Sequence, residues 1–269
     1  MEAPGFHDRD GETPWHVIGA AVQGTAHRKA GLPCQDVYMV LLLPGGSLLV
    51  AVADGAGTAE LADQGARCAV EQLMHNLSSA LEENPPEDES GWTGLVFQAY
   101  QNTQNELFRL ADELDRPVRD FATTLTCAMV VDPWFVVGQL GDGAVVAQEP
   151  GGELFSVTQA QRGEYANETF FLTQDEGLHR LEIYALNQRV NALAVMSDGL
   201  TRLALKMPSY EPHPPFFQPF FSFIHAMQDT IQAEQRLADF LASERVCART
   251  DDDKTLVLAV RRATRDEIL

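Results

Sequence analysis

The sequence predicts an α+β fold in one compact domain, and three observations support this prediction. The chain has 269 residues, of which 45% are hydrophobic, so it is long enough and apolar enough to bury a substantial core. Short apolar segments typical of strands occur near both ends, and longer segments with helical spacing lie between them. The order is strands, two helices, strands, one helix and a last strand, which favours sheets covered by helices over alternating βαβ units.

The first strands are expected at 15–24, 36–43 and 47–53, where the residues are apolar or alternate with polar ones. Pro-Gly-Gly at 44–46 separates the second of these strands from the third, as in a hairpin. The spacing of apolar residues then predicts a helix over 60–81.

A second helix is expected after the exposed linker ENPPEDES (83–90). Its apolar residues recur at intervals of four and three over 96–114, and Pro117 marks its end. Residues 159–189 show no clear period, and 222–244 have helical character. The strands expected in the second half of the chain are 122–131, 134–140, 143–148, 190–197 and 255–261.

The segment 208–221 (PSYEPHPPFFQPFF) is rich in Pro and Phe, which predicts an irregular connection packed on the core. Its phenylalanines could alternatively form a patch that binds a partner, and this alternative requires a sizeable exposed apolar surface. The residues concerned are Phe216, Phe217, Phe220 and Phe221.

Composition excludes several classes of partner. The formal net charge of −20 argues against DNA, RNA or an anionic membrane, because these partners need a basic surface. Apolar runs are too short to span a bilayer, and the polar N-terminus lacks a signal-peptide pattern, so a cytoplasmic protein is expected. The four cysteines form no CxxC pair, which argues against zinc or a redox dithiol.

Aspartates stand at the ends of several expected strands. LLVAVADGAGT (48–58), FVVGQLGDGAV (135–145) and LAVMSDGL (193–200) each run from apolar residues into Asp-Gly. TDDDKTLVLAV (250–260) instead places its acids at the start of a strand. Any one of these motifs is also typical of an ordinary hairpin turn.

If these strands are neighbours, Asp54, Asp142, Asp198 and Asp252 meet at one rim. Crowded carboxylates stay ionised only if a cation neutralises them. Oxygen ligands without His or Cys favour Mg²⁺ or Mn²⁺. Two such ions can share a water, lower its pKa and clamp a phosphoryl group.

In this order and spacing, the motifs VADGAG, GQLGDG, VMSDGL and DDKT resemble those of the metal-dependent Ser/Thr protein phosphatases of type 2C, the PPM family. GTAHRKAGLPCQD (24–36) and GEYANETFFLT (163–173) are similar to segments of its bacterial branch, and FATTLT (121–126) is similar to its Thr-Thr strand. The resemblance spans residues 19–260 and implies a single PPM-type domain over 1–269. The implied fold is a four-layer α-β-β-α sandwich with a dinuclear metal site at one end of the central β-sandwich. A flap subdomain near 150–190 would then govern substrate choice.

The resemblance also implies a role for each matching acid. Asp54 would bridge two divalent cations, Mg²⁺ or Mn²⁺, and Gly55 would ligate through its carbonyl. Asp198 and Asp252 would hold the first metal. The implied reaction is hydrolysis of phosphoserine or phosphothreonine in proteins by direct attack of the metal-bridging water, without a phosphoenzyme. Asp54, Asp198 and Asp252 are therefore the predicted catalytic residues. The predicted partner is a protein phosphorylated by a Ser/Thr kinase. The protein itself is expected to be a monomer that acts in signalling.

Within DDDK, Asp252 is the predicted ligand because Thr255 takes the family's Ser/Thr position, which leaves Asp253 in place of the usual Asn. Asp36 would hold the second metal directly or through water. Asp142, together with Asp198, would suit the weaker third metal site seen in bacterial members.

Two family features are missing from this sequence. The His that some members carry two residues after the bridging Asp is Ala56, and the phosphate-binding Arg that often precedes the first acid by four residues is Leu32. His27 and Arg28 lie nearby and are the predicted substrate-binding residues instead.

These departures suggest an alternative, a catalytically weak or inactive PPM-fold module that binds or regulates a partner. The four acids at 36, 54, 198 and 252 argue against it, because a decayed site usually loses its ligands first. A third interpretation, an acidic Ca²⁺-binding protein, lacks support because the chain has no D-x-[DN]-x-[DN]-G loop.

Overall fold

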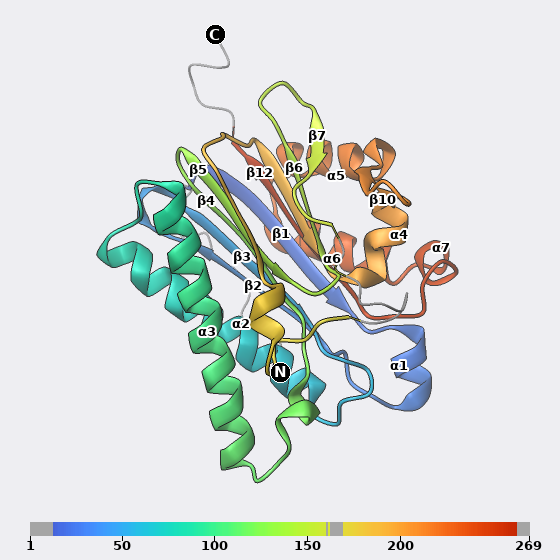
Figure 1. The fold of residues 1–269 in the computed structure, drawn as a ribbon. Helices are drawn as coiled ribbons and strands as arrows, with labels where there is room; N and C mark the ends of the chain where they lie inside the picture. The colour runs from blue at the N-terminus through green and yellow to red at the C-terminus, as the bar shows by residue number, and fades with distance from the viewer. Residues whose placement is uncertain (1–12, 160, 162–168, 263–269) are drawn as a thin grey trace.

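The structure, a computed structural model, describes residues 13–159, 161 and 169–262, and its centre consists of two five-stranded sheets (Figure 1). Neighbouring strands in both sheets run antiparallel. The first sheet has the order β2 (Asp36–Leu42), β3 (Leu48–Asp54), β4 (Leu125–Val131), β5 (Trp134–Leu140) and β8 (Glu182–Leu186). The second sheet has the order β1 (Trp15–Val22), β12 (Lys254–Arg261), β9 (Ala192–Met196), β6 (Ala144–Gln148) and β7 (Leu154–Ser156).

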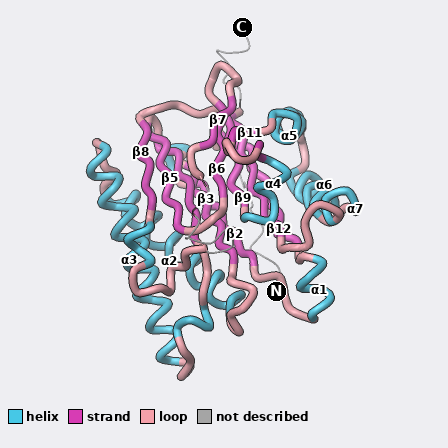
Figure 2. Tube along the Cα trace, turned by 45° about the vertical axis from the view of Figure 1, so that its right-hand side comes forward, coloured by secondary structure: helices cyan, strands magenta, loops and turns pink. Residues whose placement is uncertain are grey.

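Two groups of helices lie on opposite sides of the strands (Figure 2). One group is α2 (Ala62–Glu83) and α3 (Glu89–Glu113). The other group is α4 (Thr201–Ala204), α5 (Pro214–Ala226), α6 (Thr230–Leu241) and α7 (Glu244–Cys247). The helix α1 (Thr25–Ala30) follows β1, and a short pair, β10 (Leu205–Lys206) and β11 (Glu211–Pro212), precedes α5. Single 3-10 turns occupy Pro44–Gly46, Val118–Phe121, Gly177–Arg180 and Asp198–Leu200.

The alternation of side chains along β3 explains how the apolar residues divide among separate clusters. Leu49 and Ala51 belong to the cluster that contains α2 and α3, whereas Leu48 and Val50 belong to a cluster shared with the second sheet. Because both faces of this strand are covered, its sequence is a continuous apolar run. A further cluster joins the second sheet to α5 and α6. The prediction of a mixed fold of sheets and helices is therefore confirmed.

The helix α5 shows that the expectation of an irregular connection at 208–221 was wrong for its second half. Pro214 and Pro215 occupy the first turn, where a missing N–H costs no helical hydrogen bond, and the helix continues through Pro219. Phe217 and Phe221 lie one turn apart and are buried in the cluster with the second sheet. The burial of aromatic residues at helical spacing therefore stabilises a helix here in spite of the prolines.

The single helix expected over 222–244 is also wrong, because it is divided among the end of α5, all of α6 and the start of α7. Met227 has extended backbone, and Asp229 begins a new helix by accepting a hydrogen bond from the N–H of Gln232.

The other expected elements are present with shifted ends. The helix α3 begins at Glu89, ahead of the predicted start, because the Asp88 side chain accepts a hydrogen bond from the N–H of Gly91. The strand β8 was missed within 159–189 because its residues are mostly half-buried and show no clean alternation. Among the helices that the structure describes, none combines the length and the apolar character that crossing a bilayer requires.

Candidate metal centre

Asp36 and Asp54 lie opposite each other at one end of the first sheet. They form the terminal pair of the β2–β3 ladder, with Asp36 at the start of its strand and Asp54 at the end of the other. The N–H of Asp54 donates to Thr124 Oγ1 at 3.1 Å, and its carbonyl accepts from the N–H of Thr124 at 2.9 Å. The following residue, Gly55, donates its N–H to the carbonyl of Gln35 at 3.1 Å. The backbone around the predicted bridging acid is thus held by the residues that directly precede β2 and β4.

Asp198 brings the second sheet to the same place. It directly follows Ser197 just after the end of β9, and its carboxyl group is close enough to that of Asp54 for the charge of Asp198 to raise the pKa of Asp54. Ser197 Oγ donates to Asp36 Oδ2 at 2.7 Å and accepts from the N–H of Thr255 at 3.0 Å. This serine connects β2 of the first sheet to β9 and β12 of the second.

The proximity of these acids raises their pKa values. The pKa of Asp36 rises to about 7, first through burial and then through the charges of Asp253 and Asp198, against a hydrogen bond from Ser197 that lowers it. Burial and the charges of Asp142 and Asp252 likewise raise the pKa of Asp198 to about 7.

The pKa of Asp54 also lies well above its usual range. Burial is the largest cause, and the charges of Asp36, Asp198 and Asp252 follow. Without a cation this end of the molecule therefore favours protonated carboxyl groups, and a bound cation would favour the ionised ones.

The donor atoms fit a divalent cation. Asp36 Oδ1 and Asp198 Oδ1 are buried and have no hydrogen-bond partner among the described residues. A buried oxygen without a partner is costly, and carboxylate oxygens are the ligands that Mg²⁺ and Mn²⁺ prefer. However, within the described ranges no three His, Cys, Asp or Glu side chains form a ready group for a metal ion.

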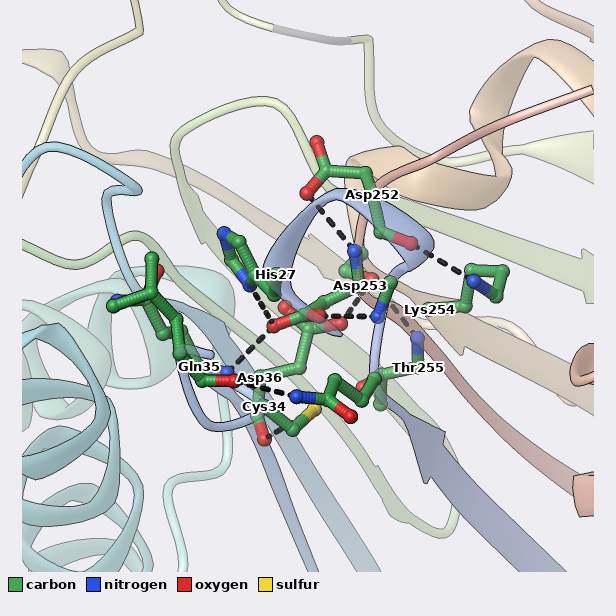
Figure 3. Close-up of polar contacts among 12 residues, drawn as sticks. His27, Cys34, Gln35, Asp36, Asp252, Asp253, Lys254 and Thr255 are labelled. Atoms are coloured by element: carbon green, nitrogen blue, oxygen red, sulfur yellow. Dashed lines mark hydrogen bonds and ion pairs between the residues drawn. The ribbon is translucent and has the colours of Figure 1, made fainter. Parts of the chain in front are cut away.

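The two neighbouring acids of the DDDK motif have different surroundings. Asp253 is 2% exposed, and its carboxylate accepts from His27 Nδ1 at 2.8 Å, the N–H of Gln35 at 2.6 Å and the N–H of Gly24 at 2.5 Å. Figure 3 shows His27 and the backbone of Gln35 turned toward this carboxylate. Asp252 is exposed, and its charge acts on both Asp54 and Asp198. Its Oδ1 accepts from the N–H of Asp253 at 2.9 Å, and Asp252 is the more accessible carboxylate of the pair.

His27 and Arg28, the predicted phosphate-binding residues, both lie on α1. The Nδ1 atom of His27 is committed to Asp253, so Nε2 is the nitrogen left for a ligand. A Cβ added to Gly57 would lie 3.6 Å from this Nε2, which places the imidazole beside the loop that follows Asp54. Arg28 is exposed.

Asp142 lies in the turn between β5 and β6, and Thr169 Oγ1 donates to its Oδ2 at 2.7 Å. Its charge is the first of those that raise the pKa of Asp198, so the two acids are close enough to interact. The segment GEYANETFFLT (163–173) lies outside the described residues up to position 168.

Several polar residues of the site were not expected from the sequence. Ser197, Gln35 and Asp253 are buried and form the hydrogen bonds that join the two sheets to α1. Lys254 is fully buried, and its Nζ donates to the carbonyl of Asp252 at 2.9 Å. These polar residues could have been identified from the sequence, because each lies beside or close to a predicted ligand and next to an apolar strand.

Comparison with known proteins identifies the family that the chain matches. The sequence model of the protein phosphatase 2C family matches residues 23–242. The chain is 36% identical over 256 residues to serine/threonine-protein phosphatase 3 of Escherichia coli (strain K12), which covers 91% of this chain and 98% of that protein.

Solved structures share the fold at low sequence identity. A bacterial serine phosphatase matches with a TM-score of 0.65 and 15% identity over 93% of this chain and 98% of its own. RsbX in complex with magnesium matches with a TM-score of 0.55 and 14% identity over 94% of this chain and 98% of its own.

Proposed function

The chain belongs to the protein phosphatase 2C family, and we propose that it hydrolyses phosphoserine and phosphothreonine in proteins with the help of divalent cations. The observation that carries the proposal is the pair of partnerless buried oxygens on Asp36 and Asp198, which flank Asp54 where the two sheets meet. Phosphoryl transfer needs positioning and compensation of negative charge more than covalent chemistry from the protein.

We propose that Asp54, with the carbonyl of Gly55, would hold two cations, Mg²⁺ or Mn²⁺. Asp198 and Asp252 would help to hold the first cation, and Asp36 the second. Bound there, the cations would supply a water of lowered pKa and neutralise the phosphoryl charge. The backbone hydrogen bonds of Asp54 to Thr124 keep its carboxylate at the end of β3. Asp142 would contribute with Asp198 to a weaker third site.

His27 orients the phosphate in this proposal. Asp253 holds Nδ1, so the Nε2 edge of the ring faces the loop after Asp54. Arg28, one residue further along α1, would supply a positive charge that attracts the phosphate.

The remaining proposals concern the whole chain. We propose a single domain over 1–269 with the four layers α-β-β-α, a flap near 150–190 that selects the substrate, and a monomer that opposes a Ser/Thr kinase. Positions 160 and 162–168 of that flap lie outside the described residues. The comparisons contain nothing that favours an inactive binding module.

The test is hydrolysis of p-nitrophenyl phosphate and of a phosphothreonine peptide after EDTA treatment, with Mn²⁺ or Mg²⁺ then restored. We expect the metal to restore activity in the wild type and not in Asp54→Asn. The exposed Asp112→Asn on α3 is the matched control and should behave as the wild type. Equal turnover in Asp54→Asn and the wild type would refute the assignment of Asp54, and a folded wild type inactive with every metal would refute the proposed function.

A further inference from the structure

A cavity of about 660 Å³ lies among α5, α6 and α7 beside β1 of the second sheet. The predicted metal ligands are not among the described residues that line it. Its volume is within the range of about 300–1,000 Å³ typical of pockets that bind small molecules.

The floor and one wall of the cavity are apolar. Ile18, Leu237 and Val246 are almost completely buried and form the floor. Phe220 packs edge-to-face against Phe216 at 5.6 Å and against Phe240 at 5.1 Å between ring centroids. Since Phe216 and Phe220 are only half-buried, part of each ring is available to a ligand.

Three arginines stand around this apolar surface: Arg236 on α6, Arg245 on α7, and Arg249 just after α7. All three are exposed, and none of the ion pairs among the described residues involves them. The guanidinium of Arg236 lies 5.9 Å from the centroid of the Phe223 ring. No Asp or Glu is found among the described lining residues. In a chain with 39 acids and 19 Lys and Arg, the cavity is therefore lined by arginines and by no acid among the described residues.

We propose that this cavity binds a small organic anion with an apolar body, alkyl or aryl, and a carboxylate or phosphate head. The body would lie against the phenylalanines, and the head would accept hydrogen bonds from the planar arginine side chains. A small anion senses mainly the nearby arginines, because charges further away than about 8–10 Å are screened at physiological salt. A large acidic partner, or a second copy of this chain, would also meet the overall charge of −20.

The test is isothermal titration calorimetry of the whole protein with decanoate and, separately, with 2-naphthoate, each below its aggregation limit. We expect saturable binding of at least one probe. Within the alkyl series from hexanoate to decanoate, affinity should increase up to about fourfold for each methylene that becomes buried. Binding of decanoate alone would identify an alkyl ligand, and binding of naphthoate alone an aryl one.

Charge reversal tests the arginines. Arg245→Glu and Arg249→Glu should each weaken binding by at least about tenfold, because each removes hydrogen bonds to a charged head. Arg67→Glu makes the same change on an exposed face of α2 and should bind as the wild type. Circular dichroism confirms that each variant is folded.

Four results would overturn the proposal. They are absence of binding by both probes, unchanged affinity in both cavity variants, equally tight binding of decyltrimethylammonium, and a wild-type dimer that Arg245→Glu dissociates in sedimentation. The last result would instead assign this surface to contact between copies of the chain.

Discussion

Replacing Asp253 by Asn tests how α1 and the candidate metal centre are joined. The carboxylate of Asp253 accepts three hydrogen bonds, from His27 Nδ1, the N–H of Gln35 and the N–H of Gly24. An Asn side chain has one acceptor oxygen. If that oxygen takes the place of Oδ2, it keeps the bonds to His27 and Gln35, and the amide NH₂ then faces the N–H of Gly24.

The expected cost follows from this loss. One hydrogen bond to a charged acceptor disappears and a buried N–H loses its partner, so the free energy of unfolding should fall by about 1.5–3 kcal/mol. For a chain of this size, each kcal/mol lowers the Tm by about 2 °C, so a decrease of about 3–6 °C is expected.

The assay is thermal unfolding in EDTA at pH 6. At this pH the Asp36 carboxyl is mostly protonated, because its pKa is about 7, so removing the charge of Asp253 relieves little repulsion. Asp251→Asn, at an exposed neighbouring position, is the control and should change stability by less than about 0.5 kcal/mol. If Asp253→Asn melts at or above the wild-type Tm while the control is unchanged, the assigned hydrogen-bonding role of Asp253 is wrong.

Two further predictions concern pH and packing. In EDTA, the folded-state pKa values of Asp36 and Asp198 are about 7, above the unfolded value of about 3.9, so their contribution to stability is present at low pH and is lost between about pH 4 and pH 7. Thermal unfolding should show a smaller loss over this window in Asp198→Asn than in the wild type, and identical pH profiles would contradict this. A Cβ at Gly65 would lie 2.1 Å from the carbonyl oxygen of Phe121, so Gly65→Ala should destabilise the fold by about 1–3 kcal/mol in urea unfolding. Gly94→Ala, where no atom lies within 4 Å, should instead stabilise α3 by about 0.5–1 kcal/mol, and equal effects at the two glycines would refute the packing argument.

Local patterns were sufficient for most of the fold. The continuous apolar run of β3 and the helical spacing in α2 depend only on residues close in sequence. The pattern failed at 208–221, where prolines suggested a break. Pro214 and Pro215 begin α5 instead, and the buried side of Phe217 and Phe221 stabilises the turns that follow.

The sequence by itself determined that acids stand at strand ends and that their order resembles a phosphatase family, because both properties lie in contiguous motifs. Only the tertiary structure decided which acid faces which partner. The Asp253 side chain is buried because its carboxylate oxygens accept hydrogen bonds from the N–H groups of Gly24 and Gln35. These two residues are 229 and 218 positions away along the chain. The arginine-lined cavity likewise exists only where α5, α6 and α7 pack beside β1. Burial and hydrogen-bond partners depend on segments that are distant in sequence and adjacent in space, so no local pattern specifies them.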